Sequence, residues 1–319
     1  MSNNSYDAKN KVGLGFYHLD PRWTTYEEFD WFVDQGYLNS FVLSAETNTL
    51  SGVIGGAQKV AETGGQVWLT LPVYLSCEQS ISDYMEGIER KVNTLKDKGV
   101  WDSVVGFHWD EPLLNKKHTN QDLYDMTKAL TDEYGLRINP VFSAYEVMGM
   151  KGNMQDPEGN TILQEFATEY LTDIGYDSYG YDFRRPYTEA QKEKLKVLGE
   201  KFEGVESTET YYKFYINKLK DRVINKDAKI WVYPCAYTPY TWAGINADED
   251  YCTAHLKGLA KILLEEKNPG GILCYTYKTW SRHHKGMDIL LQKDNPDRWV
   301  KFEQAMREVY ADIKDIEIK

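Results

Sequence analysis

The stretch that decides the fold runs from residue 67 to residue 109. Residues 67–74 read Val-Trp-Leu-Thr-Leu-Pro-Val-Tyr, an apolar run of strand length. Residues 81–98 read ISDYMEGIERKVNTLKDK, with apolar residues at helical spacing, and Gly99 follows directly. A second apolar run, residues 104–109, then begins. This order predicts a strand, a helix and a second strand.

The same unit recurs along the whole chain. Strands are predicted at residues 12–19, 38–45, 67–74, 104–109, 137–145, 174–179, 229–237 and 271–277. Helices are predicted at residues 25–35, 52–63, 81–98, 121–134, 162–171, 189–223, 250–266 and 296–313. Eight alternating units favour a single (β/α)8 TIM barrel over a doubly wound open sheet. No linker interrupts residues 1–319, so one domain is expected, with an enlarged segment at 199–226 after the sixth strand.

Glycines mark the ends of several predicted helices. Gly36, Gly64-Gly65, Gly99, Gly135 and Gly270-Gly271 each precede the next strand. A residue in the left-handed conformation commonly ends a helix, and glycine adopts that conformation without a steric penalty. The glycines therefore predict where these helices end.

Composition narrows the classes of partner. The formal net charge of −12 argues against nucleic acid or an anionic membrane surface, because both attract clustered Lys and Arg. No apolar run is long enough to span a membrane. The four cysteines, Cys77, Cys235, Cys252 and Cys274, lack zinc-site or disulfide-framework spacing. Aromatic residues make up 14% of the chain, which suits a carbohydrate surface but also an ordinary core.

The first residues, Met-Ser-Asn-Asn-Ser-Tyr-Asp, carry neither a basic region nor an apolar run. Two locations agree with this start: the cytoplasm, or the periplasm or exterior after removal of a signal segment. The second is favoured, and the oligomeric state is left open.

A barrel of this kind has its active site at the carboxyl ends of its strands. The residues expected there are mostly carboxylates and aromatics, with neither a Gly-rich phosphate loop nor Ser-His-Asp spacing. Aromatic rings stack on the apolar faces of sugars, and carboxylates carry the proton transfers of glycosidic cleavage. We therefore expect a carbohydrate substrate. The residues expected to contact it are His18, Tyr74, Trp109, Tyr179, Tyr233, Tyr237, Trp242, Tyr277 and Trp280.

The sharpest motif is Trp109-Asp110-Glu111-Pro112 at the end of the fourth strand. Burial of a carboxyl beside Trp109 would raise its pKa, as a general acid requires at neutral pH. The pair could instead cap the next helix. That helix is expected to begin near Asn120, too far away for capping. We therefore expect Glu111 to be catalytic.

The Asp-Glu-Pro triplet on strand four, with a Tyr-Asp-x-Tyr run on strand six, resembles the substrate-assisted hexosaminidases of glycoside hydrolase families 20 and 123. In those families the Asp orients the 2-acetamido group of the substrate and the Glu is the general acid/base. The resemblance implies these roles for Asp110 and Glu111, and a floor for the sugar from Trp280. It also implies that a tyrosine steadies the acetamido oxygen; the candidates are Tyr179, Tyr233 and Tyr237. The chain lacks the Gly-Gly that precedes Asp-Glu in family 20.

Two other mechanisms remain open. Retaining barrel glycosidases with Asn-Glu-Pro on strand four use a nucleophilic Glu on strand seven, but residues 229–240 contain no carboxylate. A substrate acetamide removes the need for one. Alternatively, a retaining or inverting enzyme would pair Glu111 with another carboxylate; the candidates are Glu146, Asp177 and Asp182.

The remaining candidates have structural alternatives. Asp177 could hold a substrate hydroxyl or pair with Arg184 or Arg185, and Glu146 could be a base or pair with Lys151. Adjacent histidines such as His283-His284 rarely both bind a metal ion without carboxylates placed to help. No metal and no cofactor are expected, because glycosidic cleavage needs only carboxyl groups and water. Two other functions remain open: a barrel that binds glycans at the same aromatic cleft without cleaving them, and a metal-dependent hydrolase that uses Asp110, Glu146 and Asp177. The few His residues at strand ends argue against the second.

Overall fold

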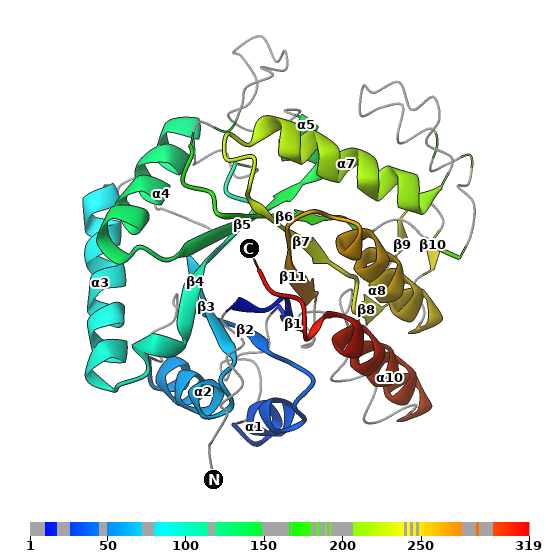
Figure 1. The fold of residues 1–319 in the computed structure, drawn as a ribbon, viewed down its shortest axis with the longest axis horizontal. Coiled ribbons are helices and arrows are strands. Elements are labelled where there is room, and N and C mark those ends of the chain that lie inside the picture. Colours follow the sequence, from blue (N-terminus) through cyan, green and yellow to red (C-terminus); the bar gives the residue numbers. More distant parts are fainter. Residues whose placement is uncertain are drawn as a thin grey trace.

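The computed structural model describes residues 10–17, 26–44, 50–71, 80–113, 119–148, 166, 168–179, 183–184, 189, 192, 207–238, 241–242, 245–246, 249–275, 285–286 and 296–318. Within these residues, eight parallel strands form a nearly closed barrel and the helices surround it (Figure 1). The predicted (β/α)8 architecture is confirmed.

The barrel strands are paired in the order β1-β11-β7-β6-β5-β4-β3-β2, and every pairing is parallel. Their bounds are β1 (Gly13–Phe16), β2 (Ser40–Ser44), β3 (Gln66–Leu71), β4 (Val104–Asp110), β5 (Arg137–Ser143), β6 (Asp173–Asp177), β7 (Lys229–Tyr233) and β11 (Pro269–Cys274). Four short strands form two antiparallel pairs, β8 (Tyr237–Thr238) with β12 (Lys285–Gly286) and β9 (Thr241–Trp242) with β10 (Ile245–Asn246).

Asn39 joins β1 to β2 and so brings the two ends of this strand order together. Its side chain accepts a hydrogen bond from the Leu14 amide at 2.7 Å and donates to the Val12 carbonyl at 3.1 Å. Its own amide donates to the Leu14 carbonyl at 3.0 Å. The approach requires glycine at position 15, where a Cβ atom would lie 1.8 Å from the carbonyl oxygen of Ser40.

The described helices are α1 (Tyr26–Asp34), α2 (Leu50–Thr63), α3 (Ile81–Asp97), α4 (Asn120–Tyr134), α5 (Ala144–Met148), α7 (Thr208–Arg222), α8 (Glu249–Leu264) and α10 (Pro296–Ile313), with a 3₁₀ turn η2 (Trp101–Ser103) before β4. Helices α1, α2, α3, α4, α8 and α10 follow the predicted positions closely. Helix α5 was not predicted, and the single helix predicted at 189–223 is interrupted at Ser207, whose backbone is extended. The helix predicted at 162–171 is wrong. There, Phe166 forms a parallel β-bridge with Val223, and residues 168–171 are not helical.

Four of the predicted glycine stops are confirmed. Gly36, Gly64, Gly99 and Gly135 all have φ between 62° and 72°, the left-handed region. The prediction for Gly270-Gly271 is wrong, since these residues lie inside β11. Added Cβ atoms there would lie 2.4 Å from the indole of Trp231, so these glycines make room for a side chain.

Part of the enlarged segment predicted at 199–226 is described. From residue 207 onward it consists of α7 and the turn that precedes β7. Helix α7 begins with a capping box in which the Ser207 and Thr210 side chains each accept from the other's backbone amide.

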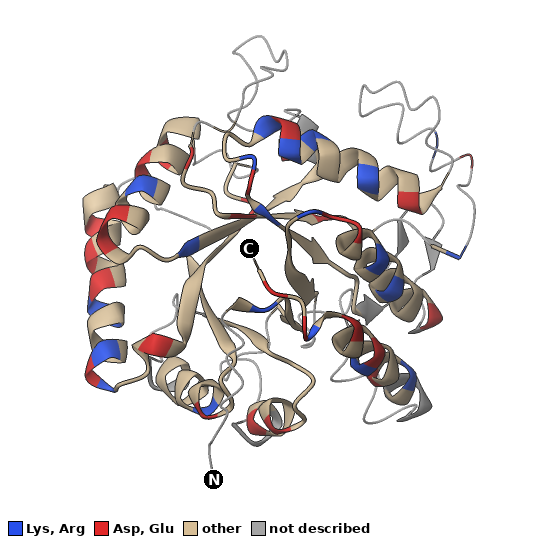
Figure 2. Cartoon of the chain, in the orientation of Figure 1, with Lys and Arg blue, Asp and Glu red and all other residues tan. Residues whose placement is uncertain are grey.

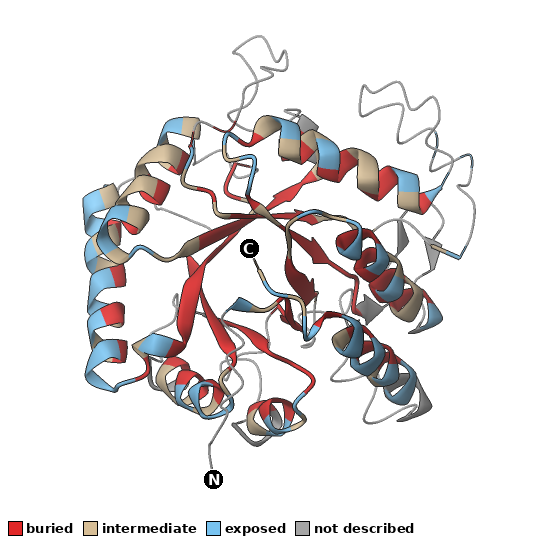
Figure 3. Cartoon of the chain, in the orientation of Figure 1, coloured by how far each residue is buried: buried red, intermediate tan, exposed pale blue. Residues whose placement is uncertain are grey.

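The hydrophobic core has two parts, one on each side of the barrel wall. The outer core fills the space between strands and helices, and the helices bury one face and expose the other (Figure 3). The charged residues gather on the helices, while the strands carry few (Figure 2). The inner core fills the barrel and consists of Tyr17, Val42, Trp68, Val105, Val141, Trp231, Tyr233 and Leu273, with Tyr179 and Tyr275 packed against it.

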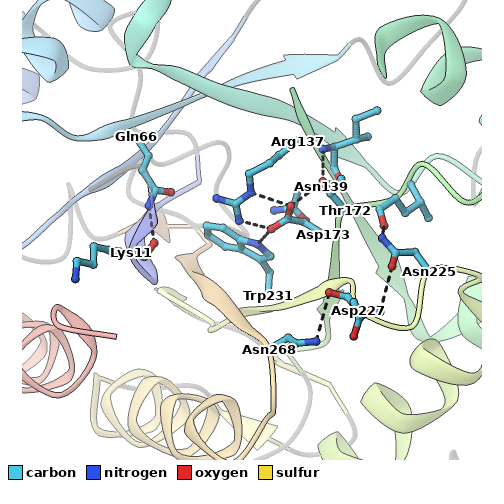
Figure 4. Close-up of polar contacts among 12 residues, drawn as sticks. Lys11, Gln66, Arg137, Asn139, Thr172, Asp173, Asn225, Asp227, Trp231 and Asn268 are labelled. Carbon is cyan, nitrogen blue, oxygen red and sulfur yellow. Dashed lines mark hydrogen bonds and ion pairs between the residues drawn. The ribbon is translucent and has the colours of Figure 1, made fainter. Parts of the chain in front are cut away.

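At the amino-terminal end of the barrel interior, an ion pair between Arg137 and Asp173 lies beside the indole of Trp231 (Figure 4). Arg137, at the start of β5, donates from Nε to Asp173 Oδ2 at 3.0 Å and pairs with Oδ1 through Nη2. Trp231 Nε1 donates to Asp173 Oδ1 at 2.7 Å, and the Arg137 guanidinium lies 4.8 Å from the Trp68 ring. The Asp173 carboxylate is fully buried, and the Arg137 guanidinium compensates its charge.

Two further features concern the predictions for membrane-spanning segments and for the cysteines. No helix in the described ranges is long and apolar enough to cross a membrane. Cys235, Cys252 and Cys274 are buried free thiols, and Cys77 lies outside the described residues.

Candidate active site

The end of β4 divides its side chains between the two faces of the barrel wall. His108 faces the interior, where its Nε2 lies 2.9 Å from the Tyr233 hydroxyl and its ring centroid 4.9 Å from that of Tyr17. Trp109 belongs to the outer core and is 1% exposed. Because successive strand residues face opposite sides, Asp110 returns to the interior. Trp109 therefore lies on the other side of the wall from Asp110, and not among the interior side chains where a sugar was expected to touch it.

Glu111 leaves the strand with an unusual backbone. Its φ is 41°, and it is the sole residue other than glycine with a positive φ among those described. Such a conformation is sparsely populated for a residue with a Cβ and persists where neighbouring contacts enforce it. One contact is the Glu111 amide, which donates to the Val141 carbonyl of β5 at 3.0 Å. The backbone turns sharply at Glu111.

The pKa of Glu111 is raised to about 9. Burial is the largest cause, since it disfavours the charged form, and the charges of Asp177 and Asp110 add to it. Glu111 is consequently protonated at neutral pH. The desolvation expected of a general acid is present, although Trp109 is not part of the interior face.

Asp177 ends β6 and reaches the same end of the barrel. The strand register pairs Asp110 with Val141, and Ser143 with Asp177. Two strand spacings of about 4.8 Å place the backbones of β4 and β6 roughly 10 Å apart, so their interior side chains converge. The pKa of Asp177 is raised well above its usual value by burial and then by Asp110 and Glu146, while a hydrogen bond from the Tyr179 side chain lowers it. We refer to Asp110, Glu111 and Asp177 as the carboxyl cluster.

Three tyrosines form a continuous stack beside the carboxyl cluster. Tyr275 follows β11 and lies 5.3 Å from Tyr179 and 5.8 Å from Tyr17, measured between ring centroids. Burial raises the pKa of Tyr275, and all three carboxyl groups of the cluster raise it further. The phenol therefore stays protonated and can donate a hydrogen bond. Of these three tyrosines, only Tyr179 was predicted from the sequence to contact the sugar; Tyr275 and Tyr17 were not.

A polar layer underlies the carboxyl cluster. The Tyr233 hydroxyl accepts a hydrogen bond from Asn139 Nδ2 at 3.4 Å and lies next to His108 Nε2. Burial lowers the pKa of His108 to about 3, so the imidazole is neutral. Asp110 and Asp177 both contribute to the raised pKa of Tyr233, after burial. Tyr233 is 1% exposed, which places it beneath the site.

Glu146 lies in the short helix α5 and is fully buried. Its Oε1 accepts from the Leu113 amide at 2.7 Å, and its Oε2 accepts from the amide and hydroxyl of Ser143 at 2.8 Å and 3.1 Å. Burial and the charge of Glu111 raise its pKa to about 8 against the lowering effect of these bonds. The spacing Ser143-x-x-Glu146 is that of a capping box, a signal that would have predicted this arrangement, whereas Glu146 was expected to be a base or to pair with Lys151.

Several other predicted residues cannot be placed at this site. His18, Tyr74, Asp182, Tyr277 and Trp280 lie outside the described residues. The backbones of Tyr237 and Trp242 belong to the short strands β8 and β9.

No group of three or more His, Cys, Asp or Glu side chains in the described ranges is arranged to hold a metal ion. The chemistry that the described side chains offer is proton transfer and hydrogen bonding by carboxyl groups and phenols.

The described residues thus form an α/β barrel with a cluster of carboxyl groups at the carboxyl ends of its strands.

No family model and no curated protein matches the sequence. The fold is similar to solved structures of a β-glucuronidase from Ruminococcus gnavus. In complex with D-glucuronic acid, that structure has a TM-score of 0.53, is 11% identical, and is matched over 92% of this chain and 49% of that one.

Two further structures of the same enzyme are similar to this chain. The complex with a C6-substituted uronic isofagomine has a TM-score of 0.54 at 11% identity, covering 93% of this chain and 50% of that one. The complex with D-glucaro-d-lactam has a TM-score of 0.52 at 12% identity, with 92% and 49% covered. This chain thus spans about half the length of these neighbours, and at such identity the similarity is one of fold.

Proposed function

We propose that the protein is a glycoside hydrolase whose substrate binds at the carboxyl ends of the barrel strands, with Glu111 as general acid/base. The observation that carries this proposal is the raised pKa of Glu111, about 9, within the carboxyl cluster. Breaking a glycosidic bond requires a proton for the leaving oxygen, and Glu111 holds one at neutral pH. The similarity of the barrel to a β-glucuronidase structure supports the same class of reaction.

The substrate is a neutral sugar in this proposal. The neighbours named above were solved with uronic acid ligands, whose carboxylate would add a negative charge. In the described residues, the charges that act on Glu111 and Asp177 all belong to carboxyl groups. A substrate carboxylate there would have only carboxyl groups as described ionisable neighbours, and its burial without a cation beside it would be costly. A 2-acetamido sugar meets this condition and offers an amide that a carboxylate can bind.

With such a sugar, the first step requires one protonated carboxyl group. Glu111 donates its proton to the glycosidic oxygen as the bond to the anomeric carbon breaks. The acetamido carbonyl oxygen attacks that carbon, while Asp110 accepts a hydrogen bond from the acetamido N–H. Glu111 then removes a proton from a water molecule that opens the cyclic intermediate, and the anomeric configuration is retained. The absence of a carboxylate in residues 229–240 favours this route.

The second candidate mechanism uses Asp177 as nucleophile or base. Its location in the carboxyl cluster supports this route, whereas its raised pKa opposes it, because a nucleophile must be ionised. Glu146 is fully buried with both oxygens already accepting hydrogen bonds, which argues against its service as a base.

The test is hydrolysis of a panel of aryl glycosides with and without a 2-acetamido group, by the wild type and by Glu111→Gln. We expect the variant to lose about 10²–10⁴-fold in kcat on glycosides with poor leaving groups. Dinitrophenyl glycosides need no proton, so their cleavage should fall much less. Glu86→Gln, on the exposed face of α3, serves as the matched control.

Each outcome of the panel has a definite meaning. Cleavage confined to acetamido sugars supports substrate assistance, and Asp110→Asn should then abolish it. Cleavage of plain hexosides excludes that mechanism and directs attention to Asp177. Glycan binding without cleavage, unchanged in Glu111→Gln, would identify a binding protein and refute the proposal.

A further inference from the structure

We propose that Glu146 is the positioning residue that sets the backbone of Glu111, by holding the chain on the far side of the turn. This inference rests on the proposed function of Glu111. It assigns Glu146 a role through Leu113 and Ser143, not through contact with substrate.

A residue at φ 41° reverts to a commoner conformation unless the chain is held on both sides of it. Before the turn, the Glu111 amide is fixed to the Val141 carbonyl at 3.0 Å. After the turn, the Leu113 amide is fixed to Glu146 Oε1 at 2.7 Å. These two bonds enclose Glu111 and Pro112, and the second depends on a side chain.

The other oxygen of Glu146 is anchored to β5. Ser143, the last residue of that strand, donates both its amide and its hydroxyl to Oε2. Ser143 is in register with Asp177. Glu146 thus ties the end of β4 to the end of β5, beside the strand that carries Asp177.

Only a carboxyl group satisfies this geometry among side chains of that length. Among the described residues three donors converge on its two oxygens, and a carboxyl group presents no N–H to either backbone amide. A glutamine would present its NH₂ group to one of the backbone amides, so one of the two connections would fail. A buried carboxyl is expensive to desolvate, and in this site it provides two strong backbone contacts in return.

Two other capping boxes in the chain indicate which substitution would separate the bond to Ser143 from the bond to Leu113. In the capping boxes of α3 and α4, an aspartate at the third helical position reaches back to the cap residue: Asp83 accepts from the Ser80 amide at 3.1 Å and Asp122 from the Thr119 amide at 2.7 Å. Glu146→Asp should therefore keep the bond to Ser143 and, being one methylene shorter, lose the bond to Leu113.

The first test is amide hydrogen exchange of the peptide that contains Leu113, compared between the wild type, Glu146→Asp and Glu146→Gln. We expect exchange at Leu113 to be at least ~10-fold faster in both variants, with α5 still protected in Glu146→Asp. Thr127→Val is the control, because Thr127 is an equally buried polar residue that bonds within α4 and to Thr168. Unchanged exchange at Leu113 would overturn the proposal.

The second test is the titration of Glu111, followed by infrared difference spectroscopy of its protonated carboxyl band. Glu111→Gln identifies the band. With the backbone released and one neighbouring carboxyl changed, the Glu111 pKa should fall in Glu146→Gln, and the alkaline limb of the kcat profile should move to lower pH with it. Among the described residues, the carboxyl groups whose pKa values are linked to that of Glu146 include Glu111 and Asp177.

The two proposals fail in different ways. On a glycoside that the wild type cleaves, Glu146→Asp should lower kcat by about 10–100-fold with little change in KM, as misplacement of a catalytic group does. Full kcat in Glu146→Asp, with Glu111→Gln inactive, would refute the positioning role alone. Full activity in Glu111→Gln would refute the catalytic role, whereas the exchange measurement would still decide whether Glu146 holds the turn.

Discussion

At the amino-terminal end of the barrel a buried carboxylate, Asp173, is paired with Arg137 and with the indole of Trp231, whereas at the carboxyl end burial, and then Asp177 and Asp110, raise the pKa of Glu111. Both ends are built from the same eight strands. At one end opposite charges compensate each other, and at the other end like charges are crowded. Residues at the first end stabilise the fold, whereas the arrangement at the second end costs stability and, in the proposed function, carries out the chemistry.

The largest effect on stability is expected at the amino-terminal end. Asp173→Asn keeps the shape but leaves the Arg137 guanidinium, 18% exposed, without its counter-charge. Breaking such a buried pair should lower the free energy of unfolding by about 3–5 kcal/mol, measured by urea denaturation.

Asp227→Asn is the matched control for this variant. Its carboxylate pairs with Lys267 on the surface, where both side chains are more than 80% exposed, so the denaturation midpoint should not move. A loss in Asp173→Asn no larger than in this control would show that the two ends of the barrel do not differ as described.

A smaller effect is expected from packing at the same end. Gly271→Ala places a Cβ atom 2.4 Å from the Trp231 ring and 2.7 Å from the Gly13 carbonyl oxygen. Overpacking of this kind should cost about 1–3 kcal/mol, read from thermal unfolding.

The control is a Gly→Ala substitution at another position, where we expect stability to rise and not to fall. Gly87→Ala, within α3, meets no atom closer than 4.0 Å and should stabilise the helix by about 0.5–1 kcal/mol. If both variants changed stability in the same direction, the role of the glycines around Trp231 would be disproved.

The raised pKa values at the carboxyl end of the barrel should make the stability of the protein depend on pH. Glu111 has a pKa of about 9 when folded and an ordinary value when unfolded, so between these values the folded state binds more protons. Stability should therefore fall as the pH rises from about 4.5 to 9, by at most about 1.4 kcal/mol per pH unit for each such carboxyl group.

Chemical denaturation at pH 6 and pH 7 measures this slope, and Glu111→Gln should make it shallower. Glu146, with a pKa of about 8, should account for a further part of the slope up to that pH. A wild-type protein whose stability rises over this interval would contradict the raised pKa values.

Local signals in the sequence were enough to predict much of the fold. Glycines at 36, 64, 99 and 135 end helices because the left-handed conformation is a local property of the chain. Gly270 and Gly271 have the same spacing but serve Trp231, a residue of a neighbouring strand, which no local pattern reveals. The helix predicted at 162–171 failed for a similar reason, since Phe166 pairs with Val223 from beyond β6.

The carboxyl cluster was predictable in outline from strand ends. Asp110 and Glu111 were predicted from their position after strand four and Asp177 from its position on strand six, and the structure brings them together. Which face each side chain takes depends on the exact end of the strand, and this misplaced Trp109. Tyr277 was predicted as a sugar contact and Tyr275 was not, because the ring contacts of Tyr275 with Tyr17 and Tyr179 join three segments that are distant in the sequence.

The strand order also has a consequence for synthesis of the chain. Strand β1 finds its ladder partner in β11, where Gly13 pairs with Gly271, so the first barrel strand to leave the ribosome pairs with the last. The ladder from β2 to β7 can assemble in order during translation, while β1, joined to β2 through the bonds of Asn39, gains its ladder partner when residues 269–274 emerge. Such distant pairing slows folding and leaves two strand edges exposed to other chains. The barrel is therefore most open to aggregation, or to help from a chaperone, in the interval before it closes.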